Sequence, residues 1–296
     1  MKLQGVMGPV ITTFEPGTEN LDIASFTSNV NAHMHAGLSG VLVCGSTGEA
    51  ALVTDDERRV LLEAARGAVP PGRLVLMGTG SESTRQTIKR CEAARAGGAD
   101  AVVVVAPHYY SSAMGIDELR VHYRAVADAS PLPVVLYNIP KYMHFALPAD
   151  LVAELALHPN VIGIKDSSGN LEMLKGFLAA QSETFTVLTG NAGTFVPALR
   201  LGARGGIMAV ALFAPALALQ MLEAHQAGDA AAADEHQAAM KPLGQVIVAE
   251  LGVPGVKAAC EIAGLHGGPP RRPLLELDEA GEKRVREALA GVVVAA

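Results

Sequence analysis

The stretch VIGIKDSSGN, residues 161–170, joins a short apolar run to a polar turn and carries one lysine, Lys165, at the junction. An apolar run of this kind is typical of a strand buried in a parallel sheet. An ammonium group taken out of water there costs several kcal/mol unless it is paired or loses its proton. A lysine that can become neutral at working pH forms Schiff bases with ketones. The alternative is a lysine at a strand end whose amine simply reaches solvent.

Similar apolar runs rich in β-branched residues recur along the chain. The eight predicted strands are Pro9–Thr12, Val41–Cys44, Leu74–Met77, Ala101–Ala106, Val134–Tyr137, Val161–Lys165, Thr186–Thr189 and Gly206–Val210. Segments with the helical period of 3.6 residues separate them, which is the pattern of a parallel sheet flanked by helices. Eight such units in about 225 residues favour a closed (β/α)8 barrel, the TIM barrel, over an open doubly wound sheet. No G-x-G-x-x-G follows the first run, which disfavours a dinucleotide-binding fold.

The strand pattern stops near residue 227. The sequence therefore predicts a barrel over residues 1–227 and a helical C-terminal extension over residues 228–296. The helices expected in the extension are Asp229–Ala249, Val256–Ala263 and Asp278–Leu289, with connecting turns at 252–255 and 267–273. Within the barrel, Thr54 and Glu57 predict a capping box at the start of one helix, and Gly97-Gly98 predicts the end of another.

The charge balance argues against two classes of partner. The chain of 296 residues has a formal net charge of −7, with 50% hydrophobic and 18% charged residues. Its basic residues form no run longer than Arg58-Arg59 or Arg271-Arg272. Nucleic acids and anionic membrane surfaces attract basic clusters, so neither is an expected partner. No apolar segment approaches the roughly 18 residues that a membrane span needs.

The cysteines and the first residues indicate the compartment. Cys44, Cys91 and Cys260 are widely spaced and form no C-x-x-C pair, so we expect reduced thiols and no metal site. Cys44 lies in an apolar run and is expected to be buried. The first residues contain no long apolar segment of the kind that directs secretion, so a cytoplasmic location is expected.

In a barrel of this type the active site lies at the C-terminal ends of the strands. The residues expected there are Ser46 and Thr47 in the turn 45–49, the pair Tyr109-Tyr110, Tyr137, Lys165 and Gly190. Each has a structural alternative on its own: a simple turn, a packing or interface aromatic, or a satisfied core phenol. Together they suit the capture of a 2-oxo acid, with amides and hydroxyls on the carboxylate, the amine on the ketone and the phenol moving protons. The missing side chain at Gly190 leaves room for a ligand.

Four motifs then carry a family resemblance over the whole chain: GSTGE at 45–49, PHYY at 107–110, YNIP at 137–140 and GIKDSSG at 163–169. Together they resemble the pyruvate-dependent class I aldolases, the family of dihydrodipicolinate synthase and N-acetylneuraminate lyase. The segments ADAVVVVAPHYY, KDSSG, GVPGVK and GGPPRRPL are most similar to the 4-hydroxy-2-oxoglutarate aldolases within it.

The resemblance implies roles for individual residues. Lys165 matches the Schiff-base lysine and Tyr137 the proton-transfer tyrosine. Ser46 and Thr47 match the hydroxyl pair that binds the pyruvyl carboxylate, and Thr47 also relays protons from Tyr137. Tyr109 matches a tyrosine that crosses the interface of a tight dimer to complete a neighbour's relay. These roles imply a homotetramer built as a dimer of dimers.

Three further positions concern the substrate. Ser167 falls where the hydroxyoxoglutarate aldolases place a serine near the far end of the substrate, and Ile207 matches a residue beside the bound keto acid. Dihydrodipicolinate synthases carry a serine-arginine pair after the YNVP-type motif, whose arginine anchors the aldehyde's carboxylate; Tyr142 stands in that place here. A phenol cannot replace a bidentate guanidinium. In the segment Lys141-Tyr142-Met143-His144, Lys141 or His144 could supply a different anion contact. The alternative for each is a solvated loop residue.

The resemblance thus implies a lyase that cleaves a 4-hydroxy-2-oxo acid, such as 4-hydroxy-2-oxoglutarate, into pyruvate and an aldehyde, or runs the reverse condensation. It implies no cofactor and no metal, because the imine on Lys165 accepts the electrons of the broken bond. Three alternatives stay open: 4-hydroxy-tetrahydrodipicolinate (dihydrodipicolinate) synthase, a 2-keto-3-deoxy sugar-acid aldolase or dehydratase, and a non-catalytic keto-acid-binding barrel.

Overall fold

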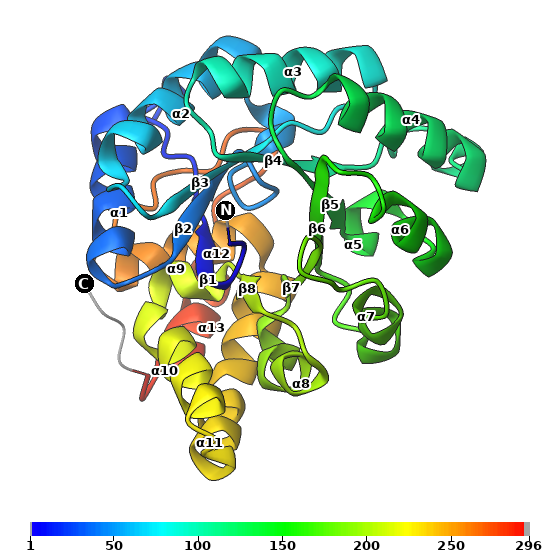
Figure 1. Ribbon diagram of the computed structural model, residues 1–296. Helices are drawn as coiled ribbons and strands as arrows, with labels where there is room; N and C mark the ends of the chain where they lie inside the picture. The colour runs from blue at the N-terminus through cyan, green and yellow to red at the C-terminus, as the bar shows by residue number, and fades with distance from the viewer. Residues whose placement is uncertain (1, 293–296) are drawn as a thin grey trace.

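The computed structural model describes residues 2–292, in which eight parallel strands close into a barrel (Figure 1). The strands pair in chain order, and β8 returns to pair with β1. They are β1 (Gly5–Pro9), β2 (Gly40–Val43), β3 (Leu74–Gly78), β4 (Ala101–Val105), β5 (Val134–Asn138), β6 (Val161–Asp166), β7 (Thr186–Thr189) and β8 (Gly205–Ile207). The predicted (β/α)8 barrel is confirmed.

Helices surround the barrel and form the C-terminal extension (Figure 1). The α-helices of the barrel segment are α1 (Ile23–His35), α2 (Asp55–Ala68), α3 (Thr84–Ala96), α4 (Ile116–Ala129), α5 (Pro140–Met143), α6 (Ala149–Leu155), α7 (Leu171–Leu178), α8 (Phe195–Leu201), α9 (Val210–Phe213) and α10 (Pro215–Gln226). Short 3-10 helices are η1 (Ala50–Leu52), η2 (Ser111–Ala113) and η3 (Ala192–Thr194). The extension holds α11 (Ala230–Pro242), the π-helix η4 (Leu243–Glu250), α12 (Gly252–Ile262) and α13 (Glu279–Leu289).

The predicted start of one helix and the predicted end of another are confirmed. The hydroxyl of Thr54 accepts a hydrogen bond from the backbone of Glu57, and the Glu57 carboxylate accepts one from the backbone of Thr54, which is a capping box at the start of α2. Gly97 caps α3, and Gly98 follows it with a positive φ of 85°.

Two strand predictions were displaced. The first strand is Gly5–Pro9, not Pro9–Thr12, and the last is Gly205–Ile207, not Gly206–Val210, because residues from Val210 onward begin α9. The two strands approach so closely at Gly205 that a Cβ atom there would lie 2.0 Å from the carbonyl oxygen of Gly5. Glycine usually weakens a strand, so a pattern of β-branched residues misses strands that need glycine for close backbone contact.

Two predictions in the extension were also wrong. The expected helix Asp229–Ala249 changes at Pro242 from α11 into the π-helix η4. Proline has no N–H to continue the α-helical ladder, and a change to wider helical turns accommodates this. The expected turn at 252–255 is instead the first turn of α12. Proline is tolerated there because the first N–H groups of a helix have no intrahelical acceptor.

The three cysteines are free thiols buried in the core. Burial raises the pKa of Cys44 to about 11 and that of Cys260 to about 12. These thiols therefore stay protonated near neutral pH, which confirms the packing role predicted for Cys44. Within residues 2–292, no helix is both long and apolar enough to cross a membrane.

A buried ion pair joins the extension to the barrel. Lys257 on α12 places its Nζ 2.7 Å from Oε1 of Glu49, and the two side chains are 2% and 0% exposed. Lys257 also donates to the carbonyl oxygen of Pro269 at 2.7 Å and lies over the ring of Phe14. Burial lowers the pKa of Lys257, while the charge of Glu49 acts in the opposite direction. The pair fixes the end of the turn 45–49 to the extension.

Arg271 adds a second connection at the same place. Its backbone N–H donates to Oε2 of Glu49 at 2.8 Å, and its guanidinium binds both carboxylate oxygens of Glu57 at 2.6 and 2.8 Å. The guanidinium also donates to the carbonyl oxygen of Leu52 and lies 4.1 Å from the ring centroid of Phe14. Arg271 lowers the pKa of Glu57 to about 2, so this carboxylate stays ionised near neutral pH.

We expect Lys257→Met to lower the free energy of unfolding by about 3–5 kcal/mol, because it leaves the Glu49 carboxylate buried without its cation. Urea titration followed by circular dichroism measures the change. The matched control is the double variant Glu49→Gln with Lys257→Met, which removes both charges and should regain a large part of the loss. Equal stability of the single and double variants would show that the charge of Glu49 is not the cause.

Candidate active site

A cavity of about 440 Å³ lies at the C-terminal ends of the strands. Strand-end residues on four strands line its floor: Pro9, Tyr137, Lys165 and Ile207. Residues of α11, η4 and α12 line the other side, so the extension forms part of the cavity wall. The cavity therefore lies between the open end of the barrel and the helices that follow it.

Lys165 and Tyr137 lie side by side on the cavity floor. They are register partners on the neighbouring strands β5 and β6, which puts both side chains on the same face of the sheet. Lys165 is 3% exposed and its Nζ lies 4.2 Å from the centroid of the Tyr137 ring. The ring face offers a weakly polar surface to the amine. The structure thus brings together the amine and phenol that the sequence singled out.

The next register pair, Asn138 and Asp166, faces away from the cavity and fixes the chain on either side of it. The Asn138 amide donates to Oδ1 of Asp166 at 2.7 Å and accepts from the backbone of Leu147 at 2.9 Å. Asp166 also accepts from the backbone and the hydroxyl of Ser168. Burial raises the pKa of Asp166 even though these hydrogen bonds lower it. The sequence analysis missed this pair, although both residues directly follow the predicted Tyr137 and Lys165.

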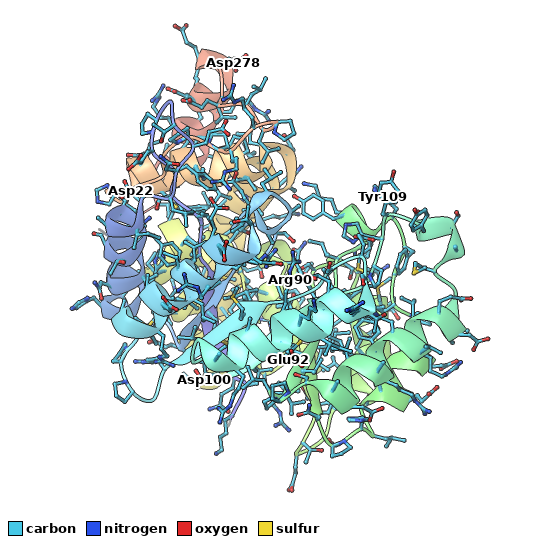
Figure 2. The ribbon with its side chains drawn as sticks, turned by 90° about the horizontal axis from the view of Figure 1, so that it is seen from above. Asp22, Arg90, Glu92, Asp100, Tyr109 and Asp278 are labelled. Atoms are coloured by element: carbon cyan, nitrogen blue, oxygen red, sulfur yellow. The ribbon has the colours of Figure 1, made fainter. Side chains whose placement is uncertain are left out.

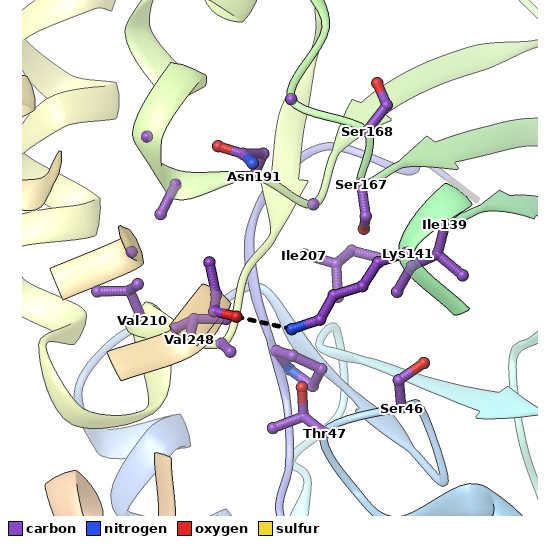
Figure 3. A pocket seen from close by; sticks show the side chains of 18 of the residues that line it. Ser46, Thr47, Ile139, Lys141, Ser167, Ser168, Asn191, Ile207, Val210 and Val248 are labelled. Carbon is purple, nitrogen blue, oxygen red and sulfur yellow. Dashed lines mark hydrogen bonds between the residues drawn. The ribbon is translucent and has the colours of Figure 1, made fainter. Parts of the chain in front are cut away.

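Ser46 and Thr47 also line the cavity, from the turn after β2 (Figure 3). This turn is held from behind: the hydroxyl of Thr12 donates to the carbonyl oxygen of Gly48 at 2.7 Å, and the adjacent Glu49 is fixed by Lys257. The two hydroxyls predicted to bind a carboxylate therefore stand on the same cavity as the Lys165 amine.

Gly190 and Ser167 form the wall beside Lys165. A Cβ atom on Gly190 would lie 1.9 Å from Oγ of Ser167 and 2.9 Å from Cε of Lys165. The missing side chain therefore makes room for the Ser167 and Lys165 side chains, and the room for a ligand expected at Gly190 stays a prediction. Ile207, at the end of β8, lines the same cavity (Figure 3).

Tyr109 lies elsewhere. Its side chain is 77% exposed, does not line the cavity, and packs edge-on against Tyr110 with 5.0 Å between ring centroids. Figure 2 shows it at the outer edge of the molecule, pointing away from the barrel. Its backbone N–H donates to the carboxylate of Glu82 at 2.8 Å. Within one chain Tyr109 takes no part in the site, and its role in a neighbour's site stays a prediction.

Only part of the segment Lys141–His144 lines the cavity. Lys141 and Tyr142, on α5, line the cavity, whereas His144 has a positive φ of 63° and ends the helix outside the cavity lining. The Lys141 ammonium donates to the carbonyl oxygen of Ala249 at 2.8 Å, on the η4 segment that also carries Val248 (Figure 3). Lys141 is therefore not a free loop lysine. Burial raises the pKa of Tyr142.

The sequence analysis also missed the contribution of the extension. Lys241, Gln245 and Val248 line the cavity from α11 and η4. No motif marked them, because the position of a helix over a barrel is not encoded in its local pattern. Among the described residues, no group of three or more His, Cys, Asp or Glu side chains is arranged to hold a metal ion.

The sequence profile of the dihydrodipicolinate synthetase family matches residues 2–291. The chain belongs to this family. With the family comes its enzyme class, so the protein is a carbon–carbon lyase of the pyruvate-dependent class I aldolase type. The resemblance to this family is confirmed, whereas the closer likeness to the 4-hydroxy-2-oxoglutarate aldolases within it stays a prediction.

Individual relatives agree with this assignment. The 4-hydroxy-tetrahydrodipicolinate synthase of Methanoculleus marisnigri is 35% identical, over 97% of this chain and 98% of its own. The crystal structure of dihydrodipicolinate synthase DapA-2 from Bacillus anthracis has a TM-score of 0.93 and 27% identity, covering 99% of each chain. The prophage protein YagE of Escherichia coli K12, solved in complex with pyruvate, has a TM-score of 0.90 and 30% identity, covering 97% of each chain.

We expect Gly190→Ala to weaken pyruvate binding on the order of 10²-fold, because the added methyl group displaces the Lys165 side chain from its position. Isothermal calorimetry with pyruvate measures the effect. Gly244→Ala is the matched control: it adds the same methyl group to the cavity lining, where the nearest atom is 3.4 Å away. Wild-type affinity in Gly190→Ala would contradict the assigned space requirement.

Proposed function

We propose that this lyase cleaves a 4-hydroxy-2-oxo acid, such as 4-hydroxy-2-oxoglutarate, into pyruvate and an aldehyde, or runs the reverse condensation. One observation carries the proposal: a buried amine, Lys165, lies 4.2 Å from the ring centroid of Tyr137 in a cavity that the Ser46 and Thr47 hydroxyls also line. An amine that opens onto a cavity at this depth is suited to nucleophilic attack on a ketone.

The first half of the reaction forms an imine. The unprotonated Nζ of Lys165 attacks C2 of the 2-oxo acid, and the resulting carbinolamine loses water as the C2–O bond breaks. Tyr137 supplies the proton that the departing hydroxyl needs. Ser46 and Thr47 hold the carboxylate, and Ile207 borders the bound keto acid. Covalent attachment replaces one difficult bond cleavage by easier steps.

The second half breaks the carbon–carbon bond. A base, assigned to the Tyr137–Thr47 relay, takes the proton of the 4-hydroxyl group, and the C3–C4 electrons move into the iminium. The aldehyde leaves, the enamine is protonated at C3, and water releases pyruvate from Lys165. The iminium provides the electron sink, so the proposed reaction uses neither a cofactor nor a metal ion. Ser167 is assigned to the far end of the substrate.

A second candidate is the synthesis of 4-hydroxy-tetrahydrodipicolinate, which the names of the curated relatives favour. It shares the imine but needs recognition of a different aldehyde. Tyr142 lines the cavity, and none of the described lining residues is an arginine. The cavity thus lacks the arginine that the resemblance gives to dihydrodipicolinate synthases, and this departure from their pattern supports the first candidate.

We also propose that the protein works as a homotetramer made of two tight dimers, in the cytoplasm. The exposure of both Tyr109 and Tyr110 supports this arrangement, because exposed paired aromatic rings are typical of an interface. In the dimer, Tyr109 reaches the proton relay of the neighbouring chain.

The imine predicts a covalent adduct. Borohydride reduction in the presence of pyruvate should add one pyruvyl mass to Lys165, found by peptide mass spectrometry, and Lys165→Ala should show none. Side-by-side assays then compare pyruvate release from 4-hydroxy-2-oxoglutarate with condensation of pyruvate and aspartate semialdehyde. Faster release from hydroxyoxoglutarate supports the first candidate, and faster condensation supports the second. Failure to trap any adduct would refute the mechanism.

The shared relay predicts complementation between chains. Tyr109→Phe should lower activity on the order of 10²-fold, because a proton relay contributes that much. Lys165→Ala should lose the imine-dependent activity altogether, because it lacks the nucleophile. Mixed dimers contain one site with an intact Lys165 and a neighbour's intact Tyr109, so mixing after mild dissociation should restore activity. If mixing restores nothing while the wild-type chain survives the same treatment, the cross-chain role of Tyr109 is wrong.

A further inference from the structure

The charge of the cavity differs from that of the protein. The chain as a whole is acidic, with a net charge of −7, but the described residues that line the cavity include three lysines and no Asp, Glu, Arg or His. The lysines are Lys141, Lys165 and Lys241. A cavity lined by one sign of charge concentrates ligands of the opposite sign. The lining therefore favours anions, and Lys141 and Lys241 are cations that the proposed imine on Lys165 does not use.

The three lysines differ in burial. Lys165 is buried on the floor, next to the Ser46 and Thr47 hydroxyls, and it is consumed by the imine of the proposed reaction. Lys141 and Lys241 are exposed and stand on different elements, α5 of the barrel and α11 of the extension. Neither forms an ion pair within the described part of the chain. Two uncompensated cations thus line the cavity besides the reacting amine.

Lys141 is held at the cavity without being neutralised. Its Nζ donates to the carbonyl oxygen of Ala249 at 2.8 Å and lies 5.5 Å from the Tyr142 ring centroid. An ammonium group has three donors, and this backbone contact uses one of them. A neutral acceptor fixes the direction of the side chain but leaves its charge free to meet a ligand. Figure 3 shows this side chain extended across the cavity.

Another part of the lining has no polar side chain. Ala192, Gly193, Val210, Val248 and Val256 present only small or apolar groups there. A ligand with several hydroxyl groups would lose hydrogen bonds to water here, and these apolar side chains offer it no hydrogen bonds in return. These five residues therefore suit a carbon chain, while Ser168, Asn191, Thr194 and Gln245 bring polar side chains to the rest of the lining.

We propose that Lys141 and Lys241 form a subsite for an anionic group, a carboxylate or a phosphoryl group, at the far end of the substrate. The substrate is then a short 2-oxo acid with two anionic ends, and Lys141, held by the Ala249 carbonyl, binds the second one with its remaining donors. This inference rests on the proposed function, since it defines the far end relative to the keto group at Lys165.

The test compares ligands of matched length. Calorimetry with 2-oxoglutarate and with 2-oxopentanoate, which ends in a methyl group instead of a carboxylate, measures the contribution of the second charge. Binding is measured in the Lys165→Ala variant, where no imine forms. We expect this variant to bind 2-oxoglutarate at least tenfold more tightly than 2-oxopentanoate. Lys141→Met and Lys241→Met should each reduce the affinity for 2-oxoglutarate about tenfold and leave that for 2-oxopentanoate unchanged. The distal phosphonate analogue of 2-oxoglutarate, as a third ligand, separates a preference for carboxylate from one for phosphoryl groups.

Lys175→Met is the control variant, because Lys175 lies on α7 outside the cavity lining and pairs with Glu172. It should bind all ligands like its parent. Equal affinity for the charged and uncharged ligands, or an equal loss for both in the lysine variants, would overturn the subsite. Because binding is measured without turnover, the subsite is judged separately from the imine. Failure of borohydride trapping with normal charge discrimination would reject the proposed function and keep the anion subsite.

Discussion

The ion pair between Glu49 and Lys257 is the contact on which the arrangement of the site depends. Two charges can be buried together only if each stays within reach of the other, so the barrel and the extension must close against one another at this point. Because Glu49 directly follows the turn that carries Ser46 and Thr47, the same contact fixes the turn. The C-terminal residues therefore stabilise a loop that lies more than two hundred positions earlier in the chain.

The barrel supplies the second constraint, which is register. In parallel strands with a fixed register, Tyr137 and Lys165 face the cavity together, while Asn138 and Asp166 face away together and hold the chain in place. This is why reading the strand ends in the sequence was enough to predict the amine and phenol as neighbours. The direction of each side chain follows from its position along the strand, and barrel closure turns one set of side chains toward the interior.

Other features could not be predicted from local pattern. The start of the last strand was missed because close backbone contact at Gly205 requires glycine, the residue that strand patterns discount. Lys241 and Val248 reach the cavity only because the extension folds back over the barrel, and nothing in their own segments indicates it. The sequence did not distinguish a solvated Lys141 from an anion contact, because the acceptor at 2.8 Å, the carbonyl oxygen of Ala249, lies more than one hundred positions later in the chain. Tyr109 belongs to a different category, since one chain does not contain the surface it is predicted to meet.

The tight space at Gly190 also bears on how such an enzyme changes over time. Every substitution of glycine adds a Cβ atom, and at this position that atom collides with the residues beside the reacting amine. Any substitution of Gly190 therefore disturbs the reacting end of the cavity. At Gly244 on η4, in the opposite wall, an added Cβ atom would meet no atom nearer than 3.4 Å, so that wall has room for a side chain. A lineage can thus exchange one aldehyde for another while its chemistry stays the same.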